Sequence, residues 1–327
     1  MTAEQGKVMF VFPGQGAQYP GMGSDLFEAF DVVRDLYDEA SSIVGFDMAR
    51  LSFEDPDSQL NFTRYTQPAL LTHELACWRA LTSLTDPAVT PQLSAGHSLG
   101  EYSALVAAGC LTFETALKLV QRRGELMGEF GEGGMLATTL DLEQAHELAD
   151  RFFCGIGGCN LPEQTVIAGA HDDLERLTQE LQATYPRKRA IPLQTEGAFH
   201  TFLMVSAAQQ FRPVLEAVTF NTPQITVLSN FTGKAHGTDA NGIRSRLFFQ
   251  LFHPVRWIGC MNTAMDEGVD TIVELGGGIG KQEGPATKRP NLEGIIKKSL
   301  KWRDHTATYV GAINLETIRA AVAELSG

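Results

Sequence analysis

The sequence has few cysteines and lacks the features that would pair them, ligate a metal or span a membrane. Its five cysteines are an odd number without Cys-x-x-Cys spacing, so neither a disulfide framework nor a zinc site is predicted. No apolar run approaches the roughly 20 residues that cross a bilayer, and residues 1–7 lack the basic and apolar regions of a secretory signal. We therefore expect a globular cytoplasmic protein with no membrane association.

Positive charge is also scarce. The chain carries 26 Lys and Arg against 39 Asp and Glu, a formal net charge of −13, which argues against a surface that binds nucleic acid. Basic residues cluster in two places. One is residues 187–189, and the other, late in the chain, consists of Lys288, Arg289, Lys297, Lys298, Lys301 and Arg303. Such runs are either solvated faces or a landing surface for an acidic partner or a phosphorylated ligand.

The order of apolar segments predicts an α/β protein. With 327 residues, 43% of them hydrophobic, the chain is long enough for one large or two ordinary domains with a real core. Residues 8–12 form an apolar run typical of a central parallel strand, broken by a glycine-rich turn at residues 13–18. Helical periodicity follows over residues 25–44 and 68–83, and Thr112 has the position of a helix cap.

Shorter units occupy residues 131–201. Strands are predicted over residues 135–139, 164–168 and 190–193, and helices over 142–152 and 174–184. This βαββαβ-like rhythm is typical of a ferredoxin-like fold. Longer helices and apolar strands (225–229 and 271–275) resume afterwards, so we expect a small subdomain of residues 131–201 inserted into a large one made of residues 1–130 and 202–327.

The pentapeptide Gly96-His-Ser-Leu-Gly100 is the main candidate for chemistry. Small residues around a serine permit a strained strand-to-helix turn that exposes Oγ and leaves the next N–H as an oxyanion donor, although similar serines occur in ordinary turns. A serine nucleophile needs a base, and His200 falls where the small unit would rejoin the large one. His97 is better interpreted as a pocket wall. The histidines without a motif, expected in surface or packing roles, are His73, His146, His171, His236, His253 and His305.

Arg122 and Arg123 lie on the following predicted helix. Either could hold a carboxylate in an apolar cleft or extend to solvent, and spacing alone does not choose between them.

Seven segments, in the same order over nearly the whole chain, resemble the malonyl-CoA:acyl-carrier-protein transacylase family. They are Phe12–Gln18 (FPGQGAQ), Tyr65–Ala69 (YTQPA), Gly96–Tyr102 (GHSLGEY), Arg123–Gly124, Asn160–Gly169 (NLPEQTVIAG), Ala198–His200 (AFH) and Pro254–Trp257 (PVRW). The resemblance implies a free-standing acyltransferase of fatty-acid or polyketide synthesis. It also implies an α/β-hydrolase-like large subdomain with a ferredoxin-like insert, with malonyl-CoA and an acyl carrier protein as partners and no metal or other cofactor.

The resemblance also implies roles for single residues. Ser98 would be acylated and His200 would be its base, oriented by the main-chain carbonyl of Gln250. Arg123 would hold the malonyl carboxylate. The remaining implied positions are the N–H groups of Gln15 and Leu99 as the oxyanion hole, with His97, Gln67, Asn160 and Phe199 lining the site. A bulky Phe199 would crowd a 2-methyl substituent and so favour malonyl over methylmalonyl groups, by roughly 1 to 3 kcal/mol.

Two segments depart from the family pattern. Residues 274–280 read Glu-Leu-Gly-Gly-Gly-Ile-Gly where the family usually has a Gly-Pro-Gly turn, and Phe202 stands where proline is common. Two other functions stay open at this point: an acyl hydrolase that releases stalled groups from carrier proteins, and a non-catalytic docking subunit.

Overall fold

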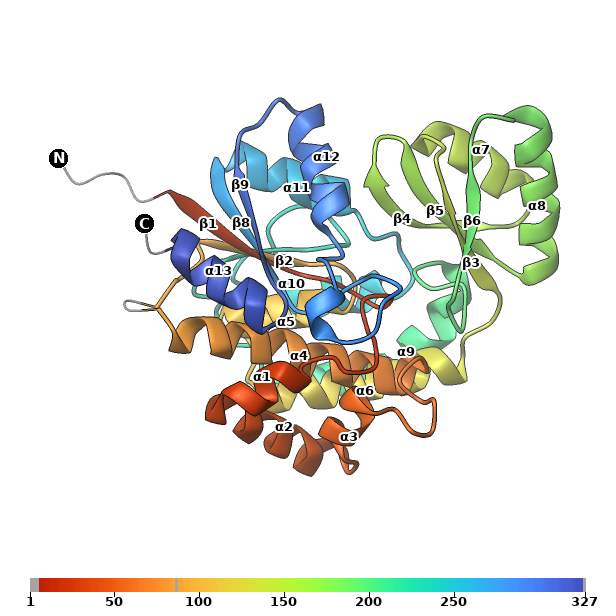
Figure 1. Cartoon of the computed structure of the whole chain (residues 1–327). Coiled ribbons are helices and arrows are strands. Elements are labelled where there is room, and N and C mark those ends of the chain that lie inside the picture. The colour runs from red at the N-terminus through yellow and green to blue at the C-terminus, as the bar shows by residue number, and fades with distance from the viewer. Residues whose placement is uncertain (1–5, 86–87, 326–327) are drawn as a thin grey trace.

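The computed structural model describes residues 6–85 and 88–325, which form two β-sheets with helices packed around them (Figure 1). The larger sheet is parallel, in the order β7-β2-β1-β8-β9. Its strands are β1 (Lys7–Phe12), β2 (Leu93–Gly96), β7 (Thr226–Leu228), β8 (Val269–Leu275) and β9 (Thr308–Ala312). The predicted α/β class is confirmed, although the sequence did not reveal β9.

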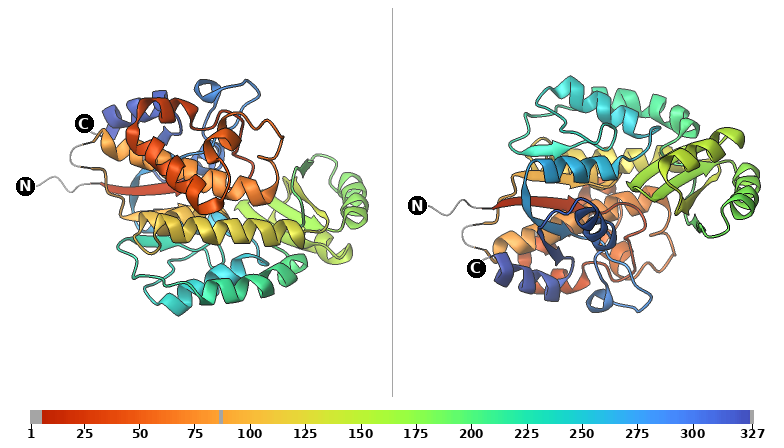
Figure 2. Two further views of the ribbon diagram at one scale, coloured as in Figure 1. Left: turned by 90° about the horizontal axis from the view of Figure 1, so that it is seen from below. Right: turned by 90° about the horizontal axis from the view of Figure 1, so that it is seen from above.

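The central strand β1 is buried on both faces, as its continuous apolar run predicts. Phe10 and Phe12 pack into one core, and Met9 and Val11 pack into another on the opposite face. Most helices cover the first face, α11 and α12 cover the second, and Figure 2 shows the molecule from both sides. The helices around this sheet are α1 (Ser24–Ala29), α2 (Asp31–Val44), α3 (Met48–Phe53), α4 (Thr63–Ser83), α5 (Gly100–Ala107), α6 (Phe113–Glu129), α9 (Val205–Glu216), α10 (Ala240–Gln250), α11 (Trp257–Asp266), α12 (Glu293–Trp302) and α13 (Leu315–Leu325), with short 3₁₀ helices η1 (Phe202–Met204) and η2 (Pro285–Thr287).

Two predicted helices differ in extent. The periodicity over residues 25–44 is divided into α1 and α2 because Phe30 takes extended angles, φ −132° and ψ 125°. Helix α4 begins at Thr63, so Pro68 lies inside it and not at its start. The predicted cap Thr112 is confirmed, since its side chain accepts a hydrogen bond from the N–H of Thr115 at 3.2 Å.

The smaller sheet is antiparallel, with the order β4-β5-β3-β6. Its strands are β3 (Gly134–Thr138), β4 (Gly155–Leu161), β5 (Gln164–Gly169) and β6 (Ala190–Leu193), and its helices are α7 (Leu142–Arg151) and α8 (His171–Thr184). The apolar pattern missed β4 because three of its seven residues are glycines. A Cβ at Gly157 would lie 2.8 Å from Met135 Cε and 3.0 Å from the Phe199 carbonyl oxygen, so close packing requires glycine there.

The turn after β8, which departs from the family pattern, packs against the glycine-rich loop after β1. Gly277 has φ +66°, which proline cannot adopt, so the turn takes a different backbone from a Gly-Pro-Gly turn. A Cβ at Gly277 would lie 2.7 Å from Ala17 Cβ and 2.8 Å from Pro13 Cγ. The N–H of Gly278 donates to the Ala17 carbonyl at 2.8 Å. The glycines therefore allow direct packing of the two loops.

Candidate active site

Ser98 lies on a strained turn between the end of β2 and the start of α5. Its φ of +54° is in the left-handed region, which few non-glycine residues adopt. A Cβ at Gly96 would be 1.8 Å from the carbonyl carbon of Gly100, and one at Gly100 would be 2.3 Å from the Phe12 carbonyl oxygen. The turn can form only with glycine at both positions, which is the steric reason for the predicted pentapeptide.

Ser98 and His200 meet although 102 positions separate them. Ser98 Oγ lies 2.8 Å from His200 Nε2, and His200 Nδ1 lies 2.7 Å from the main-chain carbonyl of Gln250. Because that carbonyl can only accept, Nδ1 carries the proton and Nε2 is left to accept one from serine. Burial, and then the positive charge of Arg123, lower the pKa of His200 to about 3, so the imidazole is neutral near pH 7.

Arg123 lies on α6 with its guanidinium buried beside the serine. The residue is 1% exposed, and Nη2 donates to Ser98 Oγ at 3.1 Å. Its other partners are neutral amide oxygens: Gln67 Oε1 at 2.9 Å from Nη1, and Gln250 Oε1 at 3.1 Å from Nη2. Within the described part of the chain no carboxylate pairs with Arg123, and its Nε is buried without a partner. By contrast, Arg122 pairs with Glu125 on the surface.

The two predicted oxyanion donors belong to adjoining turns. Asn230 Oδ1 accepts the N–H of Ser98 at 2.6 Å, whereas the N–H of Leu99 has no acceptor among the described residues. The same is true of the N–H of Gln15. The two turns pack directly, since a Cβ at Gly14 would lie 2.4 Å from the His97 carbonyl oxygen. This arrangement leaves two main-chain N–H groups available for a developing oxyanion.

The remaining predicted residues line the same site from both sheets. His97 Nε2 lies 3.0 Å from Asn160 Oδ1 on β4, and the His97 ring packs against Trp257 at 5.7 Å. Gln67 also contacts Met127, 3.4 Å from its sulfur. Phe199 is buried in a cluster that includes Met127. His97 and Asn160 therefore contact each other beside the turn, Gln67 contacts Arg123, and Phe199 lies in the same cluster as Met127.

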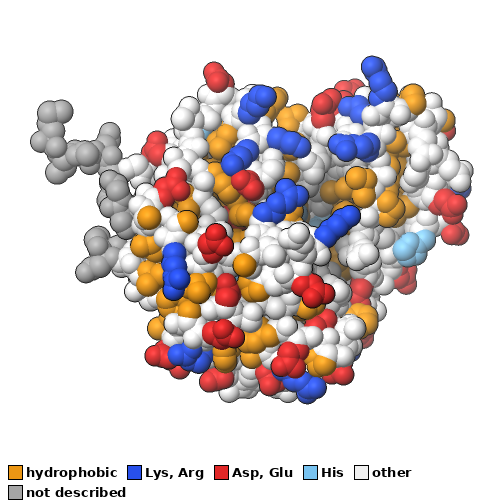
Figure 3. All heavy atoms as spheres, in the orientation of Figure 1, with side chains coloured by type: hydrophobic (Ala, Val, Ile, Leu, Met, Phe, Trp, Pro, Cys, Tyr) orange, Lys and Arg blue, Asp and Glu red, His pale blue; other side chains and the backbone are white. Residues whose placement is uncertain are grey.

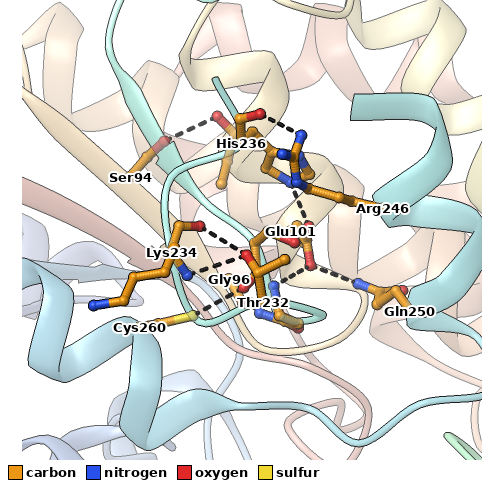
Figure 4. A network of polar contacts seen from close by, with 12 residues as sticks. Ser94, Gly96, Glu101, Thr232, Lys234, His236, Arg246, Gln250 and Cys260 are labelled. Atoms are coloured by element: carbon orange, nitrogen blue, oxygen red, sulfur yellow. Dashed lines mark hydrogen bonds and ion pairs between the residues drawn. The ribbon is translucent and has the colours of Figure 1, made fainter. Parts of the chain in front are cut away.

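Sequence reasoning missed a buried polar network directly behind the turn (Figure 4). Glu101 accepts from His236 Nε2 at 2.5 Å, from Gln250 Nε2 at 2.8 Å and from the N–H of Asn230 at 3.0 Å. His236, expected at the surface or in packing, is 1% exposed and so has the packing role, with a polar contact to Glu101 that the sequence did not predict. Glu101 could have been noticed because it is a charged residue in the otherwise apolar helix after Ser98. Nothing in the sequence linked Glu101 to Asn230.

No three His, Cys, Asp or Glu side chains gather in a cluster that could hold a metal ion within residues 6–85 and 88–325. In the same ranges, no helix is both long and apolar enough to cross a membrane.

The fold and this site define an acyltransferase of α/β-hydrolase-like architecture. Residues 9–276 match the model of the acyl transferase domain family. The chain is 39% identical over 301 residues to the malonyl CoA-acyl carrier protein transacylase of Bacillus subtilis, covering 89% of this chain and 90% of the relative. The chain belongs to the malonyl-CoA:acyl-carrier-protein transacylase family.

Solved structures of malonyl transacylases have the same fold as this chain. The malonyl CoA-acyl carrier protein transacylase of Clostridium perfringens superposes with a TM-score of 0.86 at 32% identity, covering 98% of this chain and 97% of that one. A malonyl-transacylase solved in complex with its type II polyketide acyl-carrier protein has a TM-score of 0.86 at 35% identity, covering 97% of this chain and 99% of that one.

Proposed function

We propose that this protein transfers a malonyl group from malonyl-CoA to the phosphopantetheine thiol of an acyl carrier protein, through a malonyl ester of Ser98. The observation that carries the proposal is the buried guanidinium of Arg123, which has no carboxylate within ion-pair distance among the described residues and lies 3.1 Å from Ser98 Oγ. Burying an unpaired cation is costly, so such a site favours an anionic ligand. A malonyl group supplies a carboxylate one methylene away from the reacting carbonyl.

In the acylation step, Ser98 Oγ attacks the thioester carbonyl while His200 Nε2 accepts the hydroxyl proton. The N–H groups of Gln15 and Leu99 stabilise the oxyanion of the tetrahedral intermediate. Collapse of this intermediate breaks the C–S bond, and His200 returns the proton to the departing thiolate, so coenzyme A leaves as a thiol.

The second step reverses the first with the carrier's thiol as nucleophile. His200 accepts the thiol proton, the new thioester forms, and the proton returns to Ser98 Oγ. The chain, the thioester substrate and the carrier thiol supply every proton and electron pair, so the proposal includes no cofactor. Arg123 would hold the ester with one face exposed, which disfavours the attack by water that a hydrolase requires.

Phe199 supplies a wall of the acyl site in this proposal. Its ring is 4% exposed and is confined by the buried cluster around Met127 and Met135. A rigid wall of this kind would reject a 2-methyl substituent, which gives the malonyl selectivity expected from the sequence.

We propose that residues 131–201 form the small subdomain, that residues 1–130 and 202–327 form the large one, and that the carrier docks where they meet. Between β3, the β4–β5 turn and α12 lies a cavity of about 550 Å³, lined by Arg189, Lys298 and Trp302 among others. Figure 3 shows Lys and Arg side chains along the hollow between the two lobes. Strand β4 joins this cavity to the site, because Leu161 lines the cavity and Asn160 contacts His97.

The contacts of the basic side chains favour some of them over others as partners for an acidic carrier. Lys288 donates to the Gly280 carbonyl at 2.9 Å and lies over the Tyr19 ring, and Lys297 pairs with Glu293 at 2.7 Å. Lys298 and Arg189 instead face the cavity. We therefore assign them the larger share of the electrostatic attraction.

Intact-mass spectrometry tests the reaction. Wild-type protein incubated with malonyl-CoA should gain one malonyl group, and holo carrier protein should then remove it as malonyl-carrier. The Ser98→Ala variant should gain none. A wild-type protein that stays unlabelled would support the docking-subunit alternative, and loss of the label to water at the same rate with and without carrier would support the hydrolase.

A further inference from the structure

The side-chain amide of Gln250 is buried and only one of its two orientations satisfies its neighbours. Nε2 donates to the Ser98 carbonyl at 2.9 Å and to Glu101 Oε2 at 2.8 Å, while Oε1 accepts from Arg123 Nη2 at 3.1 Å. The reversed amide would set its oxygen against two acceptors and its NH₂ against a guanidinium. The groups around Gln250 therefore decide which of its atoms Arg123 meets.

Glu101 is held so that it can act only as an acceptor toward Gln250. The residue is 0% exposed, and its other contacts are the Asn230 N–H and His236 Nε2, both nitrogen donors (Figure 4). His236 is fixed in turn, because Arg246 Nη1 donates to its carbonyl at 2.5 Å. Each of these contacts restricts the Glu101 carboxylate, so it has little freedom to turn away from Gln250.

Two amide oxygens accept hydrogen bonds from the guanidinium of Arg123, which also lies over the Tyr102 ring at 5.6 Å. Gln67 Oε1 holds Nη1 and Gln250 Oε1 holds Nη2, and together these contacts define the guanidinium plane beside Ser98. Both anchors are neutral, so they orient the cation without neutralising it. Binding of a carboxylate by Arg123 depends on the orientation of that plane, because bidentate hydrogen bonding between a guanidinium and a carboxylate is directional.

We propose that Glu101 is a positioning residue for acyl-group selection: it fixes the amide of Gln250, and through that amide the plane of Arg123. The inference rests on the proposed function, in which Arg123 binds the acyl carboxylate. Glu101 contacts neither Arg123 nor the acyl group, so its removal should weaken recognition of malonyl groups while acyl groups without a carboxylate are affected less.

The test compares acylation of Ser98 by malonyl-CoA and acetyl-CoA in Glu101→Leu and Glu101→Gln. The leucine variant lacks an acceptor for Gln250, so the malonyl-to-acetyl ratio of kcat/KM should fall about tenfold or more, chiefly through a higher KM for malonyl-CoA. The glutamine variant should keep most of the ratio. Its amide oxygen can still accept from Gln250, which is the contact that the inference requires.

Glu74→Leu is the matched control. Glu74 is also 0% exposed, and it accepts from Ser103 on the same helix as Glu101 without contacting the site. This variant should leave the ratio unchanged. If Glu101→Leu slows acylation by both thioesters equally, or changes neither, Glu101 only supports the turn and the inference is wrong.

A second variant covers the case in which Glu101→Leu does not fold. Gln250→Met keeps the main-chain carbonyl that contacts His200 but removes the amide, so it should lower the same ratio; an unchanged ratio would refute the inference. Failure of the proposed function looks different: the wild-type protein would form no malonyl adduct, or Arg123→Met would retain the malonyl preference.

Discussion

Replacing Arg123 with methionine should convert the site from malonyl-selective to one that no longer recognises a carboxylate. Methionine retains much of the volume of the buried aliphatic part of the arginine side chain and removes the positive charge. Removing one partner of a buried, hydrogen-bonded ion pair costs about 3–5 kcal/mol. At about 1.4 kcal/mol per tenfold change, kcat/KM for acylation by malonyl-CoA should fall roughly 10²- to 4 × 10³-fold.

Stability should change much less than activity. The substitution leaves Gln67 Oε1 and Gln250 Oε1 without their donor, at about 1–3 kcal/mol each, but it also removes the cost of burying an unpaired cation. These effects oppose one another. Loss of activity in Arg123→Met is therefore expected in a protein that still unfolds cooperatively.

The assay is single-turnover acylation of Ser98, followed by intact mass, with malonyl-CoA and acetyl-CoA in parallel. Acylation by acetyl-CoA should change only a few-fold, because an acetyl group has no carboxylate to lose. Arg122→Met is the matched control: it is the adjacent arginine on α6, and its surface pair with Glu125 at 2.9 Å is worth at most about 1 kcal/mol. If Arg123→Met still prefers malonyl to acetyl groups, or if both thioesters slow equally, the role assigned to Arg123 is wrong.

Further predictions concern pH, backbone space and docking. Burial lowers the pKa of His200 to about 3, so the acid limb of kcat/KM should lie well below pH 6.5, and Arg123→Met should move it upward; a limb near 6.5 in both proteins would contradict this. Burial also lowers the pKa of His73 to about 3. The stability that depends on a neutral His73 is therefore complete above pH 6.5 and is lost as the pH falls toward 3. Urea unfolding at pH 7 and at pH 5 would measure this loss. Gly96→Ala should prevent native folding because its Cβ would meet backbone at 1.8 Å, whereas Gly294→Ala meets nothing within 4 Å and should fold normally, as circular dichroism would show. Lys298→Glu should slow transfer to the carrier more than it slows acylation by malonyl-CoA. It should also slow transfer more than the same charge change at Lys118, which pairs with Glu114 and does not line the cavity; equal effects would remove Lys298 from the docking surface.

The sequence predicted those elements whose local signals agree with their tertiary environment. The apolar run at residues 8–12 became β1, and Thr112 capped its helix, because burial on both faces and capping are visible in neighbouring residues. It missed β4, whose glycines have low strand propensity and are required by contacts with Met135 and Phe199. The preference of a residue for strand cannot report how closely distant segments will approach.

For the site, the sequence by itself determined the chemical parts. The glycines around Ser98 dictated the strained turn, and the family's ordered motifs predicted His200 and Arg123 as the residues that act with Ser98. Only the tertiary structure decided how the parts are held: which N–H of the turn remains free, which of the two arginines is buried without an ion pair, and which atom of Gln250 faces Arg123. These properties depend on hydrogen bonds between residues more than 100 positions apart, such as Ser98 with Asn230 and Glu101 with His236, and they arise only when folding excludes water from both partners.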